Sequence, residues 1–87
     1  MDVCSLVGRN LRRHRMAAGL SQEALADAAG LDRTYVSGVE RGVRNPTVRV
    51  LQQIATVVGV RAMDLLADEI ATGRGETTGS PRKRLRL

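Results

Sequence analysis

The chain has 87 residues, which suffices for one small domain and leaves no room for a second hydrophobic core. It contains one Tyr and neither Phe nor Trp, so its core is expected to consist of Leu, Val, Ile, Ala and Met. The formal net charge is +5, and all but one of the 14 basic residues are Arg. This bias suits bidentate contacts to phosphate or guanine, although a GC-rich gene would produce it equally well.

The composition argues against several classes of protein. The single cysteine, Cys4, has no partner for an internal disulfide, and one Cys with one His, His14, cannot assemble a structural zinc site. No apolar run approaches the length of a membrane span, and no signal-peptide core is present near the first residues. We therefore expect a cytoplasmic protein, associated with the nucleoid if it binds DNA, that needs no metal, cofactor or membrane.

A first helix is predicted over about Leu6–Ala18. Val7, Leu11 and Ala18 recur at helical spacing and are expected to face the core. Gly19 then stands where a helix commonly ends.

Two short helices separated by a tight turn are predicted next. Ser21 is a good N-cap for the second helix, and Gly30 is placed to close it. Asp32 is the expected N-cap of the third helix, which runs to about Arg41 and stops at Gly42. The side chains expected to be buried here are Leu25, Ala26, Ala29, Leu31, Val36 and Val39. Two helices joined in this way form a unit that enters the major groove of DNA.

A fourth helix is predicted over Val48–Val58, with Thr47 as its N-cap and Gly59 at its end. A last short helix is predicted over about Ala62–Ala71, where Arg61 is a poor capping residue. The expected core residues of these two helices are Val48, Leu51, Ile54, Ala55, Val58, Leu65 and Leu66.

The composition changes after the last predicted helix. Residues 1–71 carry nine Arg against eight acidic residues, whereas residues 72–87 carry five basic residues against one acidic residue. The second segment is rich in Gly, Thr, Ser and charge, and has too little apolar surface to offset the entropy of ordering. We predict a compact five-helix, all-α domain over 1–71 and a disordered basic tail over 72–87.

At the level of individual residues, the chain resembles the Xre-type helix-turn-helix regulators, which include phage Cro proteins and lambda-type repressors. The matching positions span about Leu6 to Leu66 and follow the family's order. They are the run LSQEALA at 20–26, Tyr35-Val36-Ser37, Glu40-Arg41-Gly42, Arg44-Asn45-Pro46-Thr47, Leu51, Ile54-Ala55 and Gly59-Val60. Within the family, the segment from Asp32 to Gly42 is similar to the controller proteins of restriction-modification systems.

The resemblance implies a lambda-repressor-like fold and a recognition helix that begins after Asp32. It places Arg33, Thr34, Ser37 and Gly38 on the exposed face of that helix, with Tyr35 near its phosphate flank. An Arg at the position of Arg33 can donate two hydrogen bonds to guanine, worth about 1–3 kcal/mol of discrimination. A solvated surface Arg is the alternative interpretation.

The resemblance also implies contacts to the DNA backbone. Gln22 would brace a phosphate or the groove-reading side chains, and Arg41, Arg44 and Asn45 would meet phosphates. Asn45 has a second interpretation, because the residue before Pro46 often serves only to shape a turn.

Two further features concern packing. The resemblance implies that Arg15 pairs with Glu40 beneath the surface. Val50 and Val57 lie seven residues apart on the fourth helix, whose core contacts are already provided by other residues. They form an additional apolar edge, with Met63 beside it, and this edge predicts a homodimer interface. The alternative is that these residues complete a larger core.

The leading hypothesis is a transcription regulator that binds a palindromic double-stranded DNA operator as a homodimer and recruits or blocks RNA polymerase. Two-fold pairing would place two recognition helices about 34 Å apart on one face of DNA. An antitoxin-like module that binds DNA and a protein partner is the alternative. An enzyme is not expected, since the acidic residues do not form a spaced pair with a nucleophile and the sequence has no phosphate-binding Gly loop or metal-binding constellation.

Overall fold

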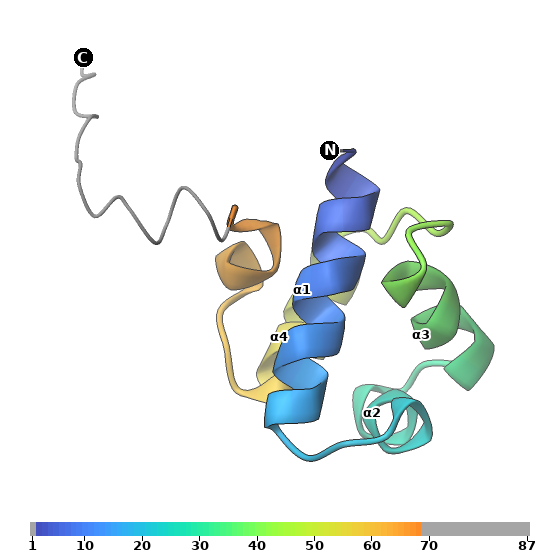
Figure 1. Ribbon diagram of the computed structural model, residues 1–87. Helices are drawn as coiled ribbons and strands as arrows, with labels where there is room; N and C mark the ends of the chain where they lie inside the picture. The colour runs from blue at the N-terminus through green and yellow to red at the C-terminus, as the bar shows by residue number, and fades with distance from the viewer. Residues whose placement is uncertain (1, 69–87) are drawn as a thin grey trace.

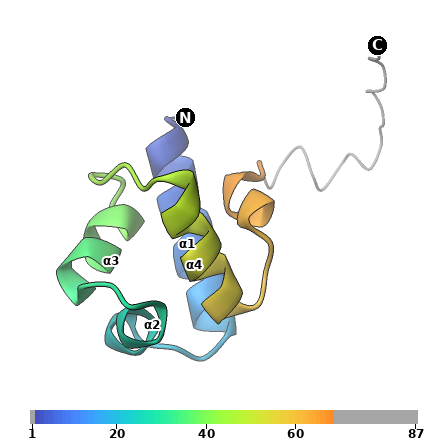
Figure 2. The same ribbon diagram turned by 180° about the vertical axis from the view of Figure 1, so that it is seen from behind.

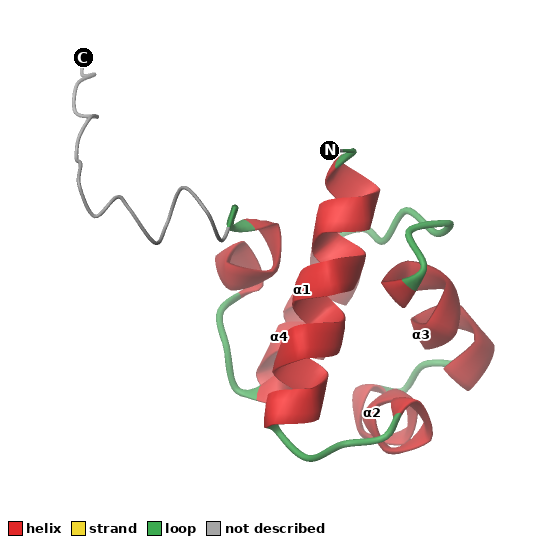
Figure 3. Cartoon of the chain, in the orientation of Figure 1, coloured by secondary structure: helices red, strands yellow, loops and turns green. Residues whose placement is uncertain are grey.

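The computed structural model describes residues 2–68, and those residues form an all-helical fold without a strand (Figure 3). Four α-helices are followed by one short 3-10 helix. In chain order they are α1 (Val3–Ala17), α2 (Gln22–Ala29), α3 (Arg33–Glu40), α4 (Val48–Val58) and the 3-10 helix η1 (Ala62–Leu66). None of these helices is long and apolar enough to cross a membrane.

α1 and α4 run through the middle of the molecule, with α2 and α3 on one side and η1 on the other (Figures 1 and 2). α1 contacts α3 and η1, while α4 contacts α2 and η1. α2 and α3 therefore pack against the two central helices on one side, and the opposite side of α3 is open to solvent.

The core is aliphatic, as the composition predicted, but Met16 and Met63 are exposed and take no part in it. Every helix contributes to it, including η1 through Leu65, which is fully buried. The buried apolar side chains are Val7, Leu11, Leu25, Ala26, Ala29, Val36, Val39, Leu51, Ile54, Ala55, Val58 and Leu65. All of them were predicted to be buried, because apolar residues that recur at helical spacing share the face of the helix that packs into the core.

The predicted N-caps of the three middle helices are confirmed. The Ser21 hydroxyl accepts from the Ala24 N–H at 3.0 Å, and the Thr47 hydroxyl accepts from the Val50 N–H at 3.1 Å. The Asp32 carboxylate accepts from the Thr34 N–H at 3.3 Å, which fixes the first turn of α3.

The start of α1 was predicted too late. The helix begins at Val3, because the Asp2 carboxylate accepts a hydrogen bond from the Cys4 N–H at 3.0 Å and caps it. At the other end, Ala18 is the C-cap and is exposed, so its predicted burial was wrong.

The last helix was predicted too long and of the wrong type. It is a 3-10 helix that stops at Leu66, and Ala67 and Asp68 are not helical. Asp64 compensates for the poor cap by accepting from the Arg61 N–H at 2.9 Å. This hydrogen bond, with a second one from the Arg61 guanidinium, lowers the pKa of Asp64.

Three residues expected in the core are more exposed than predicted. Val48, the first residue of α4, is 78% exposed, and Leu66, the last residue of η1, is 45% exposed. Leu31 is only half-buried, at the turn between α2 and α3. The predicted tail at 72–87, and the end of the predicted domain at 69–71, lie outside the described residues.

Two residues of α1 that the sequence analysis did not single out fix its neighbours. Asn10 is fully buried, and its amide donates to the carbonyls of Leu65 and Ala67 at 3.0 and 2.8 Å, which ties η1 to α1. Gly8 lies against the end of α3, where a Cβ would come within 2.5 Å of the Val39 and Glu40 carbonyl oxygens. The close approach of α1 and α3 therefore requires glycine at this position.

Candidate nucleic-acid interface

The N-terminal turn of α3 presents polar side chains to solvent. Arg33 and Thr34 are exposed, and Ser37, one turn later, is half-buried. The opposite face of the helix is anchored in the core by Val36 and Val39, which are fully buried. α3 is thus a capped helix that is anchored in the core and exposes the side chains of its first turn.

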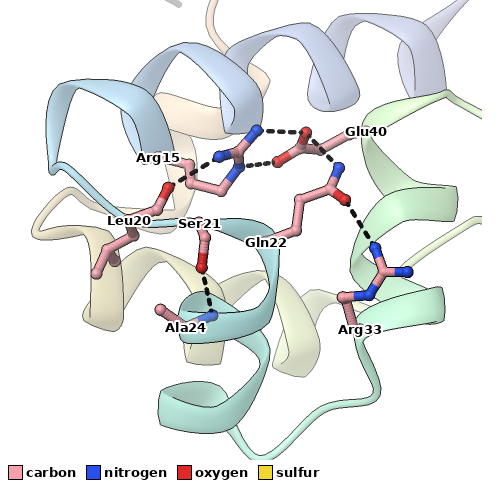
Figure 4. A network of polar contacts seen from close by, with 7 residues as sticks. All are labelled: Arg15, Leu20, Ser21, Gln22, Ala24, Arg33 and Glu40. Atoms are coloured by element: carbon pink, nitrogen blue, oxygen red, sulfur yellow. Dashed lines mark hydrogen bonds and ion pairs between the residues drawn. The ribbon is translucent and has the colours of Figure 1, made fainter.

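A polar network behind α3 connects it to α1 and α2 (Figure 4). The predicted pair of Arg15 and Glu40 is confirmed: Nε and Nη2 of Arg15 donate to the two carboxylate oxygens at 2.5 and 3.1 Å. Arg15 also donates to the Leu20 carbonyl at 2.8 Å. The side chains of Arg15 and Glu40 are only 12% and 4% exposed, and their hydrogen bonds raise the pKa of Arg15.

Gln22 extends this network to the exposed surface. Its amide nitrogen donates to Glu40 at 3.1 Å, and its amide oxygen accepts from the Arg33 guanidinium at 3.5 Å (Figure 4). The bond to Arg33 is long, so it orients that side chain weakly and leaves it able to turn toward a ligand. The bond to Glu40 was not predicted, because it depends on how α2 and α3 pack.

Gly38 was placed on the exposed face of α3, and this was wrong. Gly38 is buried, because the side chain of Arg44 lies over it. The Arg44 guanidinium carbon stands 5.8 Å from the centre of the Tyr35 ring, within the range of a cation–π contact. Tyr35 is itself half-buried and packs against the core.

The loop between α3 and α4 continues the basic surface. Arg41, Arg44 and Asn45 are all exposed. Arg33, Arg41 and Arg44 thus give three exposed arginines on α3 and the loop that follows it. The nearby Glu40 carboxylate is paired with Arg15, so its charge is already balanced. A surface of this kind suits a polyanion.

The predicted dimer residues fall into two groups. Val50 and Val57 are half-buried and pack against the core, as the alternative interpretation held, yet each keeps part of its surface free. Met63 is 60% exposed on η1. A role in self-association stays a prediction for all three.

The family model described as "Helix-turn-helix" matches residues 11–65, which is more than half of the chain. The chain belongs to the helix-turn-helix family. This confirms the resemblance to the Xre-type helix-turn-helix regulators that the sequence indicated. Proteins of this type are DNA-binding transcription regulators.

Similar proteins include control protein C.SmaI of Serratia marcescens, which is 39% identical over 66 residues, covering 76% of this chain and 79% of that protein. The crystal structure of the restriction-modification controller protein C.AhdI from Aeromonas hydrophila is 45% identical, with a TM-score of 0.69 over 71% of this chain and 94% of that one. The hypothetical transcription factor NHTF from Neisseria is 39% identical, with a TM-score of 0.78 over 82% of both chains.

Proposed function

We propose that the chain is a transcription regulator that binds a palindromic operator as a homodimer, with α3 in the major groove. The observation that carries this proposal is the exposed, capped first turn of α3 in a helix-turn-helix protein, with Arg33 and Thr34 pointing away from the core. The proposal predicts tight, sequence-dependent binding to one duplex. Fluorescence anisotropy titrations against specific and scrambled duplexes test it, and equal affinity for both would reject it.

Base recognition is assigned to the start of α3. Arg33 donates to guanine O6 and N7, and Thr34 offers its methyl group to thymine or its hydroxyl to a base or phosphate. Ser37, one turn after Arg33 on α3, and Tyr35, near the phosphate flank, contact the edge of the site. Gln22 supports Arg33 through the hydrogen bond described above.

Backbone contacts are assigned to the loop after α3. Arg41, Arg44 and Asn45 are exposed there and reach phosphates on the flank of the groove in which α3 lies. Contacts of this kind give affinity and register, and contribute little to the choice of sequence.

The Arg44→Ala substitution is expected to reduce the salt dependence of operator binding by about one released counterion per subunit, because one phosphate contact is lost. The measurement is the slope of log Kd against log salt concentration. Arg9→Ala is the matched control, since Arg9 is an exposed Arg on α1 with no assigned contact. A slope that Arg44→Ala leaves at the wild-type value would remove Arg44 from the phosphate contacts.

The proposed dimer interface consists of Val50, Val57 and Met63. Val57→Asp is expected to weaken self-association by at least tenfold, because a carboxylate would be desolvated between the subunits. Sedimentation velocity over a range of concentrations measures it. Thr56→Asp places the same charge on the neighbouring, exposed position and should leave the dimer intact; equal behaviour of the two variants would move the interface elsewhere.

We further propose that the protein controls restriction-modification genes. The similarity to C.SmaI and C.AhdI supports this assignment. In vitro transcription from the promoter next to its own gene, with added RNA polymerase and with or without the protein, tests it. A change in transcript level that requires the operator is expected.

A further inference from the structure

We propose that Gly38 is a positioning residue, whose missing side chain seats Arg44 against α3 and so sets where the guanidinium stands. The DNA consequences of this inference rest on the proposed function, whereas the positioning itself does not.

The backbone of Arg44 is fixed by Gly38. The Gly38 carbonyl accepts from the Val43 N–H at 3.0 Å and from the Arg44 N–H at 3.2 Å. These two bonds draw the loop back over the last turn of α3 and hold the start of the Arg44 side chain there. Any adjustment of Arg44 must therefore come from its side-chain torsions.

The side chain of Arg44 fills the space that a Cβ at position 38 would need. A Cβ built on Gly38 would lie 2.5 Å from Cγ of Arg44, and 3.4 and 3.5 Å from its Nε and Cδ. Because Cγ is only one bond beyond the Cβ of Arg44, relieving such a clash requires a different χ1 rotamer. That rotation carries the guanidinium away from its present position.

Gly38 is explained by the lack of space for a Cβ, and not by a backbone conformation that favours glycine. The glycines with a positive φ among the described residues are Gly19, Gly30, Gly42 and Gly59, so Gly38 has an ordinary helical backbone. Glycine is a poorer helix former than alanine, and its presence within the eight residues of α3 therefore needs another reason. The covering Arg44 side chain supplies that reason.

Tyr35 is the second residue of α3 that contacts the Arg44 side chain. Its ring centre is 5.8 Å from the Arg44 guanidinium carbon. Gly38 lies three residues after Tyr35 on α3, so both face the returning loop. Between them they select one position of Arg44 at the edge of the proposed DNA interface.

The positioning is tested in the free protein by NMR. Tyr35 is the only Phe, Tyr or Trp in the chain, so an upfield ring shift of the Arg44 δ-methylene protons reports this contact. The shift, and the nuclear Overhauser effects to Tyr35, should be lost in Gly38→Ala. Retention of both would overturn the proposal, whatever the protein binds.

The consequence for DNA is tested by a double-mutant cycle with Gly38→Ala, Arg44→Ala and the combined variant. Gly38→Ala should weaken operator binding by about five- to tenfold in the presence of Arg44 and by less than about twofold when residue 44 is Ala. An equal loss in both backgrounds would mean that position 38 acts independently of Arg44. If no variant and no wild-type protein prefers the operator, the proposed function fails while the NMR result stands.

Folding is followed by circular dichroism for each variant. Gly38→Ala should retain the wild-type helical signal. If it unfolds, the combined variant should fold again, because removing Arg44 removes the clash; a combined variant that stays unfolded would overturn the proposal.

Discussion

Replacing Arg15 by Met is expected to lower the free energy of unfolding by about 3–5 kcal/mol. The substitution keeps most of the volume of the side chain but leaves the Glu40 carboxylate, 4% exposed, with Gln22 as its remaining partner. An unpaired buried charge is costly, and small domains have only about 5–15 kcal/mol of stability in total. Urea denaturation followed by circular dichroism measures the change.

Two comparisons make this result specific. The double substitution Arg15→Met with Glu40→Leu removes both charges and should recover much of the loss, as expected for a buried pair. Asp64→Asn removes the charge from the surface pair with Arg61 but keeps a side-chain oxygen that can accept from the Arg61 N–H, so it should scarcely move the urea midpoint. A small loss in Arg15→Met, comparable with that of Asp64→Asn, would contradict the structural role given to the network of Figure 4.

Arg33→Ala is expected to have the largest effect on sequence preference. It should relax discrimination at one or two base pairs in each half-site, by about 1–3 kcal/mol, because a bidentate contact to guanine is lost. Competition titrations against operators with every single-base change measure this. The network of Arg15, Glu40 and Gln22 remains in the variant, so the fold should be unaffected.

The pattern of losses separates the two interpretations of Arg33. A phosphate contact would weaken binding to all duplexes by the same factor, and a solvated Arg would change nothing. Arg9→Ala serves again as the control for removal of one positive charge. Uniform losses across all operator variants would exclude base reading by Arg33.

Much of the fold could be predicted from the sequence because its signals are local. Ser21, Thr47 and Gly59 are capping residues whose effects reach only one turn, and the buried faces of α2, α3 and α4 follow from spacing within each helix. Where a boundary depended on a distant contact, the prediction was wrong. The helix expected at 62–71 shows this. The side chain of Asn10 on α1 donates to the carbonyls of Leu65 and Ala67, and η1 ends at Leu66, between these two residues.

The candidate site divides in the same way. The exposure of Arg33 and Thr34 was implied by the resemblance to the Xre-type regulators, and it is confirmed. The burial of Gly38 depends on the path of the loop at 43–46, which no local pattern encodes. The link from Gln22 to Glu40 likewise appears only once α2 and α3 are packed together.

Selection of bound duplexes from a random pool by the wild-type protein tests the central claim, that α3 reads DNA in a two-fold assembly. The proposal predicts an inverted repeat whose half-sites are centred about one helical turn, or a multiple of it, apart, with a guanine at a fixed position in each half. A pool that shows no enrichment, or an enriched sequence without two-fold symmetry, would contradict it.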